Sequence, residues 1–461
     1  MSTEPAVERL SGAALAALRQ KGIACPTYDR AQASGIVHFG IGAFARAHLA
    51  WYTDKGLADG DQGWMITGVS LRSAAVMAQL NPQQGLYSLT ERAAGQADTR
   101  IIGSIREVLV ADRHAPQIVE RIADPACHIV SFTVTEKGYC RAVNGTLDQS
   151  LAAGGFYPLL GHALSLRADA DLPGVTLLCC DNLASNGAVL GGLMRDYLAV
   201  HHPKALDWFN ARCTYPATMI DRIVPAMTAE ALDEAQALLG GCRDEGAIFT
   251  EAFSQWVIED RFAGPRPRWE DHGAQIVADV APYETAKLRM LNGAHSLLAY
   301  CGLEKGHEFV HQAIVDPELR AVTLRLMLEE AAPTIRAAEG QDLTAYAAAL
   351  VERFENPALQ HRLAQIAMDG SQKLPQRWLA VLSERQSEGV ASPAIMRGLA
   401  SWLRHVRGGL GPVNDPLAAQ LAAAWQQGGP EQAIRRIVGL GGLLGSIWQP
   451  TDDDVVQLQK H

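Results

Sequence analysis

The first half of the chain alternates short runs of β-branched and apolar residues with longer stretches of helical character. This alternation is typical of βαβ units, in which parallel strands are joined by crossover helices. The pattern therefore predicts a Rossmann-type, doubly wound α/β sheet domain. Two later segments, TYPATMI (214–220) and QWVIED (255–260), either extend this sheet or begin a smaller element. The candidate strands of the sheet are IVHF (36–39), MITGVSL (65–71), HIVSFTV (128–134) and VTLLCC (175–180).

The character of the sequence changes near residue 283, where strand patterns give way to helices punctuated by Gly and Pro. A length of 461 residues is sufficient for two or three domains. We therefore predict a dinucleotide-binding domain over residues 30–282. A mainly α-helical substrate and catalytic domain is predicted over residues 283–461.

Composition argues against several classes of protein. A net charge of −10 without a long basic run argues against nucleic acid as a partner. No apolar run reaches the roughly 20 residues that span a bilayer, and no secretory signal pattern is visible. The eight cysteines form no CxxC pair, and no HExxH motif occurs. We therefore expect a cytoplasmic protein with reduced thiols, no membrane association, no metal and a small-molecule substrate.

A glycine-rich turn follows the first predicted strand. Gly40, Gly42 and Ala45 fit the pattern G-x-G-x-x-G/A, in which small residues permit a tight turn, close approach of pyrophosphate and close helix packing. The following helix directs free N–H groups at the phosphates. Arg46 and His48 either contribute to this site or lie on an ordinary helix surface. The residues expected to contact the cofactor here are Gly40, Gly42, Ala43, Phe44 and Arg46.

The second predicted strand ends at Ser70-Leu71-Arg72-Ser73, without the acidic residue that usually binds the ribose 2′-hydroxyl. Arg72 and the two serines can accept a 2′-phosphate instead. Alternatively, other groups hold the ribose. We therefore expect NAD as the cofactor, with NADP as a physical alternative, and Arg72 as a further cofactor-binding residue.

The segment YETAKLRMLNGAHSLLAY (283–300) mixes charged and apolar residues on one predicted helix. At about 100° per residue, Glu284, Lys287 and His295 fall within an arc of roughly 80°, and Asn292 lies about 60° further round. Such mixing indicates a buried helix that contacts a polar group in a cleft. The alternative is a surface pair between Glu284 and Lys287, with His295 as a satisfied core histidine.

Seven motifs occur in the order found in one family, the polyol-specific long-chain dehydrogenase/reductases, which the chain resembles from about residue 36 to about residue 378. This family includes mannitol 2-dehydrogenase, arabinitol dehydrogenase and fructuronate reductase. The arrangement of Lys287, Asn292 and His295 as K-x-x-x-x-N-x-x-H is the most specific match. The motifs are IVHFGIGAFARAHLAWYTD, VSFTVTEKGYC, CCDNLASNG, MIDRIVPAMT, FSQWVIED, GAQIVADVAPYETAKLRMLNGAHSLLAY and QIAMDGSQKLPQR.

The resemblance implies a metal-independent, nicotinamide-dependent oxidoreductase of open-chain sugar derivatives. It implies that Lys287 is the general acid/base and that Asn182 and Asn292 stabilise the alkoxide-like oxygen. It also implies that Glu284 passes protons between the lysine and solvent. A side-chain base is needed because, without zinc, a side chain must take the hydroxyl proton. A lysine can act as this base if burial lowers its pKa. Neutral amides can stabilise the developing oxyanion by donating hydrogen bonds to it. The residues implied to hold substrate hydroxyls are Asp221, His295 and Lys373.

Each of these roles has a structural alternative. Asn182 can form an Asx turn or a helix cap, Asp221 can pair with Arg222, and Lys373 can be a solvated loop lysine. The chain also departs from the family pattern: Ala45 stands where a histidine is common. A further arginine that the family uses near Arg362 has no certain counterpart.

The resemblance favours reversible reduction of D-fructuronate to D-mannonate with NADH, because four of the motifs look closer to fructuronate reductases than to mannitol dehydrogenases. A carboxylate-bearing substrate requires a cation, for which Lys373, Arg377 and Arg222 are candidates. The alternative enzyme is a polyol 2-dehydrogenase that oxidises mannitol, arabinitol or sorbitol. A hypothesis from another class is a regulatory protein that binds the cofactor and has lost the chemistry.

Overall fold

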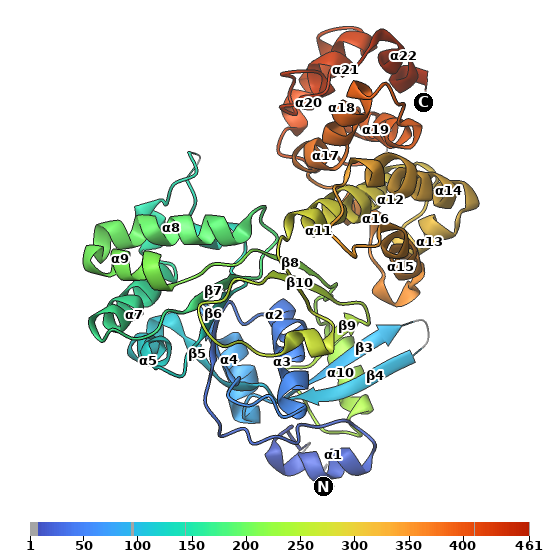
Figure 1. The fold of residues 1–461 in the computed structure, drawn as a ribbon. Helices are drawn as coiled ribbons and strands as arrows, with labels where there is room; N and C mark the ends of the chain where they lie inside the picture. The colour runs from blue at the N-terminus through green and yellow to red at the C-terminus, as the bar shows by residue number, and fades with distance from the viewer. Residues whose placement is uncertain (1–7, 94–95, 143, 410, 461) are drawn as a thin grey trace. The chain divides into compact units, whose positions relative to one another are not determined.

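The computed structural model describes residues 8–93, 96–142, 144–409 and 411–460. The chain divides into two compact units, unit 1 (Met1–Val280) and unit 2 (Ala281–His461). Figure 1 traces both along the chain. Unit 1 contains the sheets and unit 2 is built from helices, which confirms the predicted fold class.

A five-stranded parallel sheet forms the centre of unit 1, with the strand order β5-β2-β1-β6-β7. The chain starts in the middle at β1, builds outward to one edge and then returns to the other side of β1. This is the order of a Rossmann sheet, whose switch point lies between the first and fourth strands. The sequence did not predict β5. The strands are β1 (Ile36–Phe39), β2 (Ile66–Ser70), β5 (Ile105–Val110), β6 (Ile129–Phe132) and β7 (Thr176–Cys179).

Helices cover both faces of this sheet because alternate strand residues point to opposite sides. Val37 and Phe39 of β1 belong to one hydrophobic core, whereas Ile36 belongs to another. The first core includes α5 (Ala111–Ala123), α7 (Tyr157–Asp169), α8 (Asn186–His201) and α9 (Pro203–Arg212), which Figure 1 shows on one side of the sheet. The second core includes α2 (Ala43–Ala47), α3 (Leu49–Ala58) and α4 (Ala75–Leu80).

Two smaller sheets complete unit 1. The predicted strands at 214–220 and 255–260 pair antiparallel in a separate sheet of order β11-β10-β8. The first of them meets the central sheet only through an isolated parallel bridge between Thr214 and Thr176. A hairpin and a distant strand form the other sheet, of order β4-β3-β9. These strands are β8 (Thr218–Asp221), β10 (Gln255–Glu259), β11 (Gln275–Val277), β3 (Tyr87–Ala93), β4 (Gln96–Ile102) and β9 (Ile248–Glu251).

A buried histidine ties β1 to β6 at the switch point. Thr133 Oγ1 donates to Gly40 O at 2.7 Å, so it accepts from His38 Nε2 at 2.9 Å. Burial lowers the pKa of His38 to about 3, so the imidazole is neutral at physiological pH. With its proton on Nε2, Nδ1 then accepts from Ser131 Oγ at 2.8 Å. This chain of hydrogen bonds fixes the backbone where the glycine-rich turn begins.

We expect His38 to make the protein acid-sensitive. An unfolded histidine titrates near pH 6.5, so below that pH the unfolded chain binds a proton that the folded protein excludes until about pH 3. Stability therefore falls as pH falls through this window, by about 2 kcal/mol at pH 5. A His38→Gln variant keeps hydrogen-bonding groups but does not titrate. Its urea-unfolding midpoint should drop less between pH 7 and pH 5 than that of the wild type; an equal drop contradicts this assignment.

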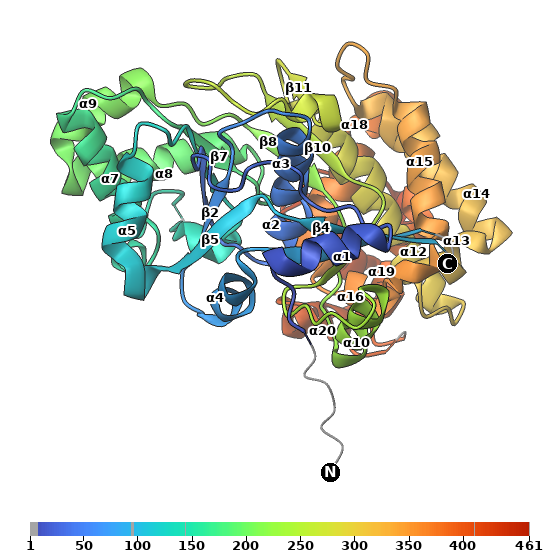
Figure 2. The same cartoon turned by 90° about the horizontal axis from the view of Figure 1, so that it is seen from below.

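Unit 2 is organised around α12 (Gly293–Glu304), whose residues 293–302 are all buried. A helix that is apolar on every side must be surrounded by others, and α12 packs on α13, α14, α16 and α19. Figures 1 and 2 show α12 and α19 side by side. The other helices are α11 (Ala281–Ala286), α13 (Val310–Val315), α14 (Pro317–Arg325), α15 (Leu343–Glu355), α16 (Leu363–Ile366), α17 (Gly370–Leu374), α18 (Ala380–Ser387), α19 (Pro393–Val406), α20 (Ala418–Gln426), α21 (Pro430–Val438) and α22 (Asp452–Lys460).

Within the described part of unit 2, three segments are π-helical: η5 (Lys287–Asn292), η6 (Leu326–Ala331) and η9 (Pro375–Leu379). The first of them packs against both of the others. π-Helical turns, with hydrogen bonds from i to i+5, are rare and often occur at functional sites. In the chain, η5 follows α11 directly and leads directly into α12.

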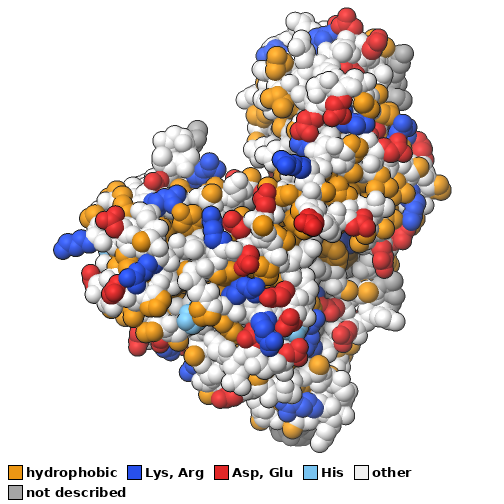
Figure 3. Space-filling view, viewed as in Figure 1, with side chains coloured by type: hydrophobic (Ala, Val, Ile, Leu, Met, Phe, Trp, Pro, Cys, Tyr) orange, Lys and Arg blue, Asp and Glu red, His pale blue; other side chains and the backbone are white. Residues whose placement is uncertain are grey.

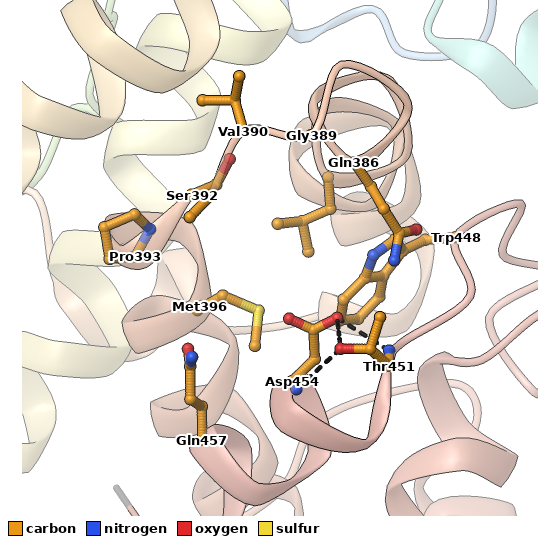
Figure 4. A pocket seen from close by; sticks show the side chains of 12 residues that line it. Gln386, Gly389, Val390, Ser392, Pro393, Met396, Trp448, Thr451, Asp454 and Gln457 are labelled. Carbon is orange, nitrogen blue, oxygen red and sulfur yellow. Dashed lines mark hydrogen bonds between the residues drawn. The ribbon is translucent and has the colours of Figure 1, made fainter.

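A pocket of about 330 Å³ lies in unit 2 beside the start of α19 and α22 (Figure 4). Its apolar lining includes Trp448, Met396 and Leu382. Thr451 Oγ1 donates to Asp454 Oδ2 at 2.8 Å on its polar side. None of the residues expected to bind substrate or cofactor lines this pocket.

The surface carries both signs of charge. On the face drawn in Figure 3, acidic and basic side chains are interspersed over each unit, as on an ordinary solvated surface. No helix within the described ranges is long and apolar enough to cross a membrane. The described residues also contain no group of three or more His, Cys, Asp or Glu side chains placed to hold a metal ion.

Candidate active site

The glycine-rich turn follows β1 at the switch point of the central sheet. Gly40 has a φ of +94°, and a Cβ there would lie 2.1 Å from Thr133 O, so only glycine fits. Gly42 is different, because the nearest atom to a Cβ at that position would be Gly40 O at 3.8 Å. The protein thus leaves room beside Gly42, as close approach of a pyrophosphate requires. Ala45 is buried, which allows close packing of the helix.

The short helix α2 places its residues in two environments. Ala43 and Phe44 remain partly exposed, and the Phe44 ring stacks on His48 with ring centroids 5.2 Å apart. Arg46 and His48 are buried, so the surface interpretation of both is wrong. Arg46 Nη1 donates to Gly246 O at 2.6 Å and its Nε donates to Gly42 O at 3.3 Å. Arg46 thereby braces the turn, and its contact with the cofactor stays a prediction.

Arg72 lies just beyond β2 and is exposed. Ser70 Oγ donates to Ser73 O at 2.6 Å, which closes the bend around it. A carboxylate is missing from residues 70–73, as the sequence already indicated. The role of Arg72 toward a ribose hydroxyl or 2′-phosphate stays a prediction.

Asn182 follows β7, in a loop that neighbouring polar groups hold in place. Asp181 accepts from Val134 N at 2.9 Å, Thr135 N at 3.2 Å and Tyr139 Oη at 2.7 Å, which joins the ends of β6 and β7. Asn182 itself is exposed. The N-cap of α8 is Ser185, so the helix-cap interpretation of Asn182 is wrong. The loop instead presents Asn182 at the carboxyl edge of the parallel sheet, where ligands of such sheets bind.

Asp221 is the last residue of β8 and is buried. Its neighbour Arg222 forms a salt bridge with Glu91 and donates to Ala47 O at 2.6 Å and Glu251 O at 3.0 Å. Arg222 is thus committed to holding β8, β3 and β9 together. It is therefore a poor candidate for binding a substrate carboxylate.

Lys287 and Asn292 are the first and last residues of η5. Because hydrogen bonds in a π-helix run from i to i+5, residues five positions apart come closer to one face than in an α-helix. The expected offset of Asn292 from Lys287 assumed α-helical spacing, which η5 does not have. Lys287 is only 8% exposed, so it is not half of a solvated surface pair. Glu284 is partly buried on α11, three residues before it.

The side-chain amide of Asn292 has no hydrogen-bond partner among the described residues, although its backbone carbonyl does. His295 is 9% exposed, and its ring lies 4.7 Å from that of Phe354 and 5.2 Å from that of His361. Burial, followed by the charges of His361 and Arg353, lowers the pKa of His295 well below its ordinary value. Within the described ranges neither of its ring nitrogens is hydrogen-bonded. A satisfied core histidine is therefore the wrong description.

Lys373 and Arg377 lie on neighbouring turns of α17 and η9. Lys373 Nζ donates to Met368 O at 2.6 Å and Ile366 O at 3.4 Å, and burial together with Arg377 lowers its pKa. Lys373 is thus partly buried and held by backbone carbonyls rather than being a solvated loop residue. Arg377 Nη1 donates to Ser296 Oγ at 2.8 Å and to Asn292 O at 3.2 Å.

Sequence reasoning missed the π-helix and the groups around His295. His361 and Arg353 belong to this neighbourhood, and the run QHR at 360–362 offered only a weak signal. Arg362, near which the family uses an arginine, forms an ion pair with Glu308 and stacks its guanidinium 5.0 Å from the centre of the Phe309 ring. The structure therefore commits Arg362 to a surface contact within unit 2.

Comparisons with known proteins agree across nearly the whole chain. Residues 34–271 match the mannitol dehydrogenase Rossmann domain, and residues 279–443 match the mannitol dehydrogenase C-terminal domain. D-mannonate oxidoreductase of Escherichia coli (strain K12) is 40% identical over 450 residues, covering 92% of this chain and 91% of the relative.

Two solved structures share the fold closely. A D-sorbitol dehydrogenase in its substrate-free form has a TM-score of 0.84 at 32% identity, with 90% of each chain covered. Pseudomonas fluorescens mannitol 2-dehydrogenase, solved as a ternary complex with NAD and D-mannitol, has a TM-score of 0.80 at 30% identity, with 98% of this chain and 96% of that chain covered. The chain belongs to the mannitol dehydrogenase family.

Proposed function

We propose that the protein interconverts D-fructuronate and D-mannonate, with Lys287 as the general acid/base. The chain is an NAD-dependent dehydrogenase that acts on a CH–OH group of a sugar acid or polyol. The choice of the sugar acid rests on the 40% identity to a D-mannonate oxidoreductase over nearly the full length of both chains. It also rests on the cations Lys373 and Arg377, which a carboxylate-bearing substrate requires.

The observation that carries the mechanism is η5, which begins with a buried lysine and ends with an asparagine whose side-chain amide has no partner among the described residues. Burial favours the neutral form of an amine, which can take a proton from a hydroxyl group. An amide can donate to the developing oxyanion without competing for the proton. One rigid segment thus offers both groups that oxidation of a secondary alcohol needs.

The residues of the turn after β1 would hold the dinucleotide, since the room beside Gly42 fits its pyrophosphate. Bound NAD supplies the acceptor and donor of hydride. In the oxidation direction Lys287 takes the hydroxyl proton while Asn182 and Asn292 donate to the same oxygen. Glu284 passes that proton to solvent. Asp221, His295 and Lys373 hold the remaining hydroxyl groups and so orient the reacting carbon.

A substrate panel tests the assignment. Fructuronate, tagaturonate and fructose are assayed for reduction, and mannonate, mannitol, arabinitol and sorbitol for oxidation, each with the NAD and NADP couples. We expect the highest kcat/KM with fructuronate and NADH. A kcat/KM for fructose well above that for fructuronate contradicts the sugar-acid assignment.

The second candidate is a polyol 2-dehydrogenase. The likeness to a D-sorbitol dehydrogenase and to a mannitol 2-dehydrogenase, at TM-scores of 0.84 and 0.80, favours it. The same catalytic residues serve both reactions. The two candidates differ only in the groups that recognise the end of the substrate, where a sugar acid carries a carboxylate and a polyol carries a hydroxymethyl group.

A further inference from the structure

Arg377 is a cation attached to the segment that carries the proposed catalytic residues. Its Nη1 makes both of its hydrogen bonds, to Asn292 O at 3.2 Å and to Ser296 Oγ at 2.8 Å. The next residue, Trp378, donates from Nε1 to Gly293 O at 3.3 Å. Two adjacent side chains of η9 thus bind adjacent carbonyls at the junction of η5 and α12. The guanidinium is thereby fixed at the end of η5.

Among the described residues, Arg377 has no acidic partner. No carboxylate within the described ranges lies at ion-pair distance from Arg377, whereas Arg222 of unit 1 pairs with Glu91. Burial lowers the pKa of Arg377 to about 10. The positive charge of Arg377 contributes to lowering the pKa values of His295 and Lys373. A largely buried charge without a partner is costly. An anionic ligand would supply the missing charge.

The orientation of the guanidinium suits such a ligand. Since Nη1 is used for anchoring, Nε and Nη2 have no hydrogen-bond partner among the residues that the structure describes. These two nitrogens form one edge of the planar group, and that edge can bind both oxygens of a carboxylate at once. Arg377 also keeps part of its surface exposed. The Nε–Nη2 edge is therefore available to a ligand.

We propose that Arg377 is a specificity-determining residue that binds the carboxylate of a sugar-acid substrate through its Nε–Nη2 edge. The inference rests on the proposed function and identifies the residue that separates a sugar acid from a polyol. A purely structural role would need only the Nη1 contacts. It would not explain why the Nε–Nη2 edge has no hydrogen-bond partner and the charge no acidic partner among the described residues.

The test compares two ketoses that differ in one group, fructuronate and fructose. An Arg377→Leu variant should lower kcat/KM for fructuronate by about 100-fold, the loss expected for a charge-assisted bidentate contact, mainly through KM. The kcat/KM for fructose should fall much less, because only the anchoring contacts are lost for that substrate. Equal losses on both substrates would show a structural role and overturn the inference, as would an unchanged kcat/KM for fructuronate.

Milder variants keep the test decisive if Arg377→Leu folds poorly. Arg377→Lys retains the charge but not the planar edge, and Ser296→Ala removes one anchor while keeping the cation. Each should lower the ratio of kcat/KM for fructuronate to that for fructose, the serine variant by roughly 3- to 10-fold. Arg397→Leu removes an arginine of α19 that pairs with Glu318 and should leave the ratio unchanged. If neither milder variant lowers the ratio, the inference is wrong.

A wild-type enzyme that prefers fructose would contradict the proposed function but would still allow this inference to be tested. Competitive inhibition by mannonate and by mannitol then decides. A Ki for mannonate that rises in Arg377→Leu, with an unchanged Ki for mannitol, supports the carboxylate contact. Equal changes in the two Ki values overturn it.

Discussion

Replacing Lys287 by alanine is expected to lower kcat by about 10²- to 10⁴-fold, the contribution of a positioned general acid/base. The reason is that removal of hydride from a CH–OH group also requires removal of the hydroxyl proton, which a buried lysine side chain can take. Stopped-flow absorbance of NADH in a single turnover measures the hydride-transfer step directly. The variant should show the same NADH affinity as the wild type, because the glycine-rich turn proposed to hold the dinucleotide is unchanged.

A lysine further along the same helical stretch provides the control. Lys305, at the end of α12, is exposed and pairs with Asp316 and Glu318, so Lys305→Ala should turn over like the wild type. If Lys287→Ala binds NADH and retains wild-type turnover, the proposed mechanism is wrong.

Replacing Asn292 by alanine is expected to lower kcat by about 10²- to 10³-fold, the cost of removing one donor to a developing oxyanion. The amide contributes only where the oxygen gains charge, so KM should change much less than kcat. An Asn292→Asp variant should be slower still, because a carboxylate repels the oxyanion and offers no N–H. Initial rates over a range of substrate concentrations separate the two constants.

Arg377 contacts the backbone carbonyl of Asn292 rather than its side chain, so both Asn292 variants should keep the local fold. Near-ultraviolet circular dichroism and the thermal midpoint check this. An Asn292→Asp variant as fast as the wild type would exclude a role for this amide in stabilising negative charge.

The parts of the fold that follow from local pattern were predictable from the sequence. β1 and its turn combine a short apolar strand with two glycines at fixed spacing, and the structure needs glycine at position 40 for a steric reason. The helical character of unit 2 follows in the same way from long apolar periodicity. β5 and the hairpin of β3 and β4 were missed; these three strands follow one another without an intervening helix, so they lie outside the strand–helix alternation from which the sheet was predicted.

Details that depend on contacts far apart in sequence were not readable. The pairing of Arg222 with Glu91 joins residues 131 positions apart, and the sequence suggested Asp221 as the partner. The π-helical turn at Lys287 was also invisible, because a sequence pattern is interpreted with α-helical spacing. That turn nevertheless sets the angular spacing of Lys287 and Asn292 around the helix axis. The residue types proposed for the site come from the sequence and stay predictions, whereas the π-helical form of the segment that carries Lys287 and Asn292 was not predictable from it.

The central claim is that the amine of Lys287 carries the proton. Its most direct test is the rate of the Lys287→Ala variant in the presence of added primary amines of similar size and different basicity, such as ethylamine and 2-fluoroethylamine. The account predicts that turnover rises with amine concentration and is greater for the more basic amine at equal concentration of the free base. Turnover that stays at the low level of the variant at every amine concentration, with NADH and substrate bound as in the wild type, would contradict it.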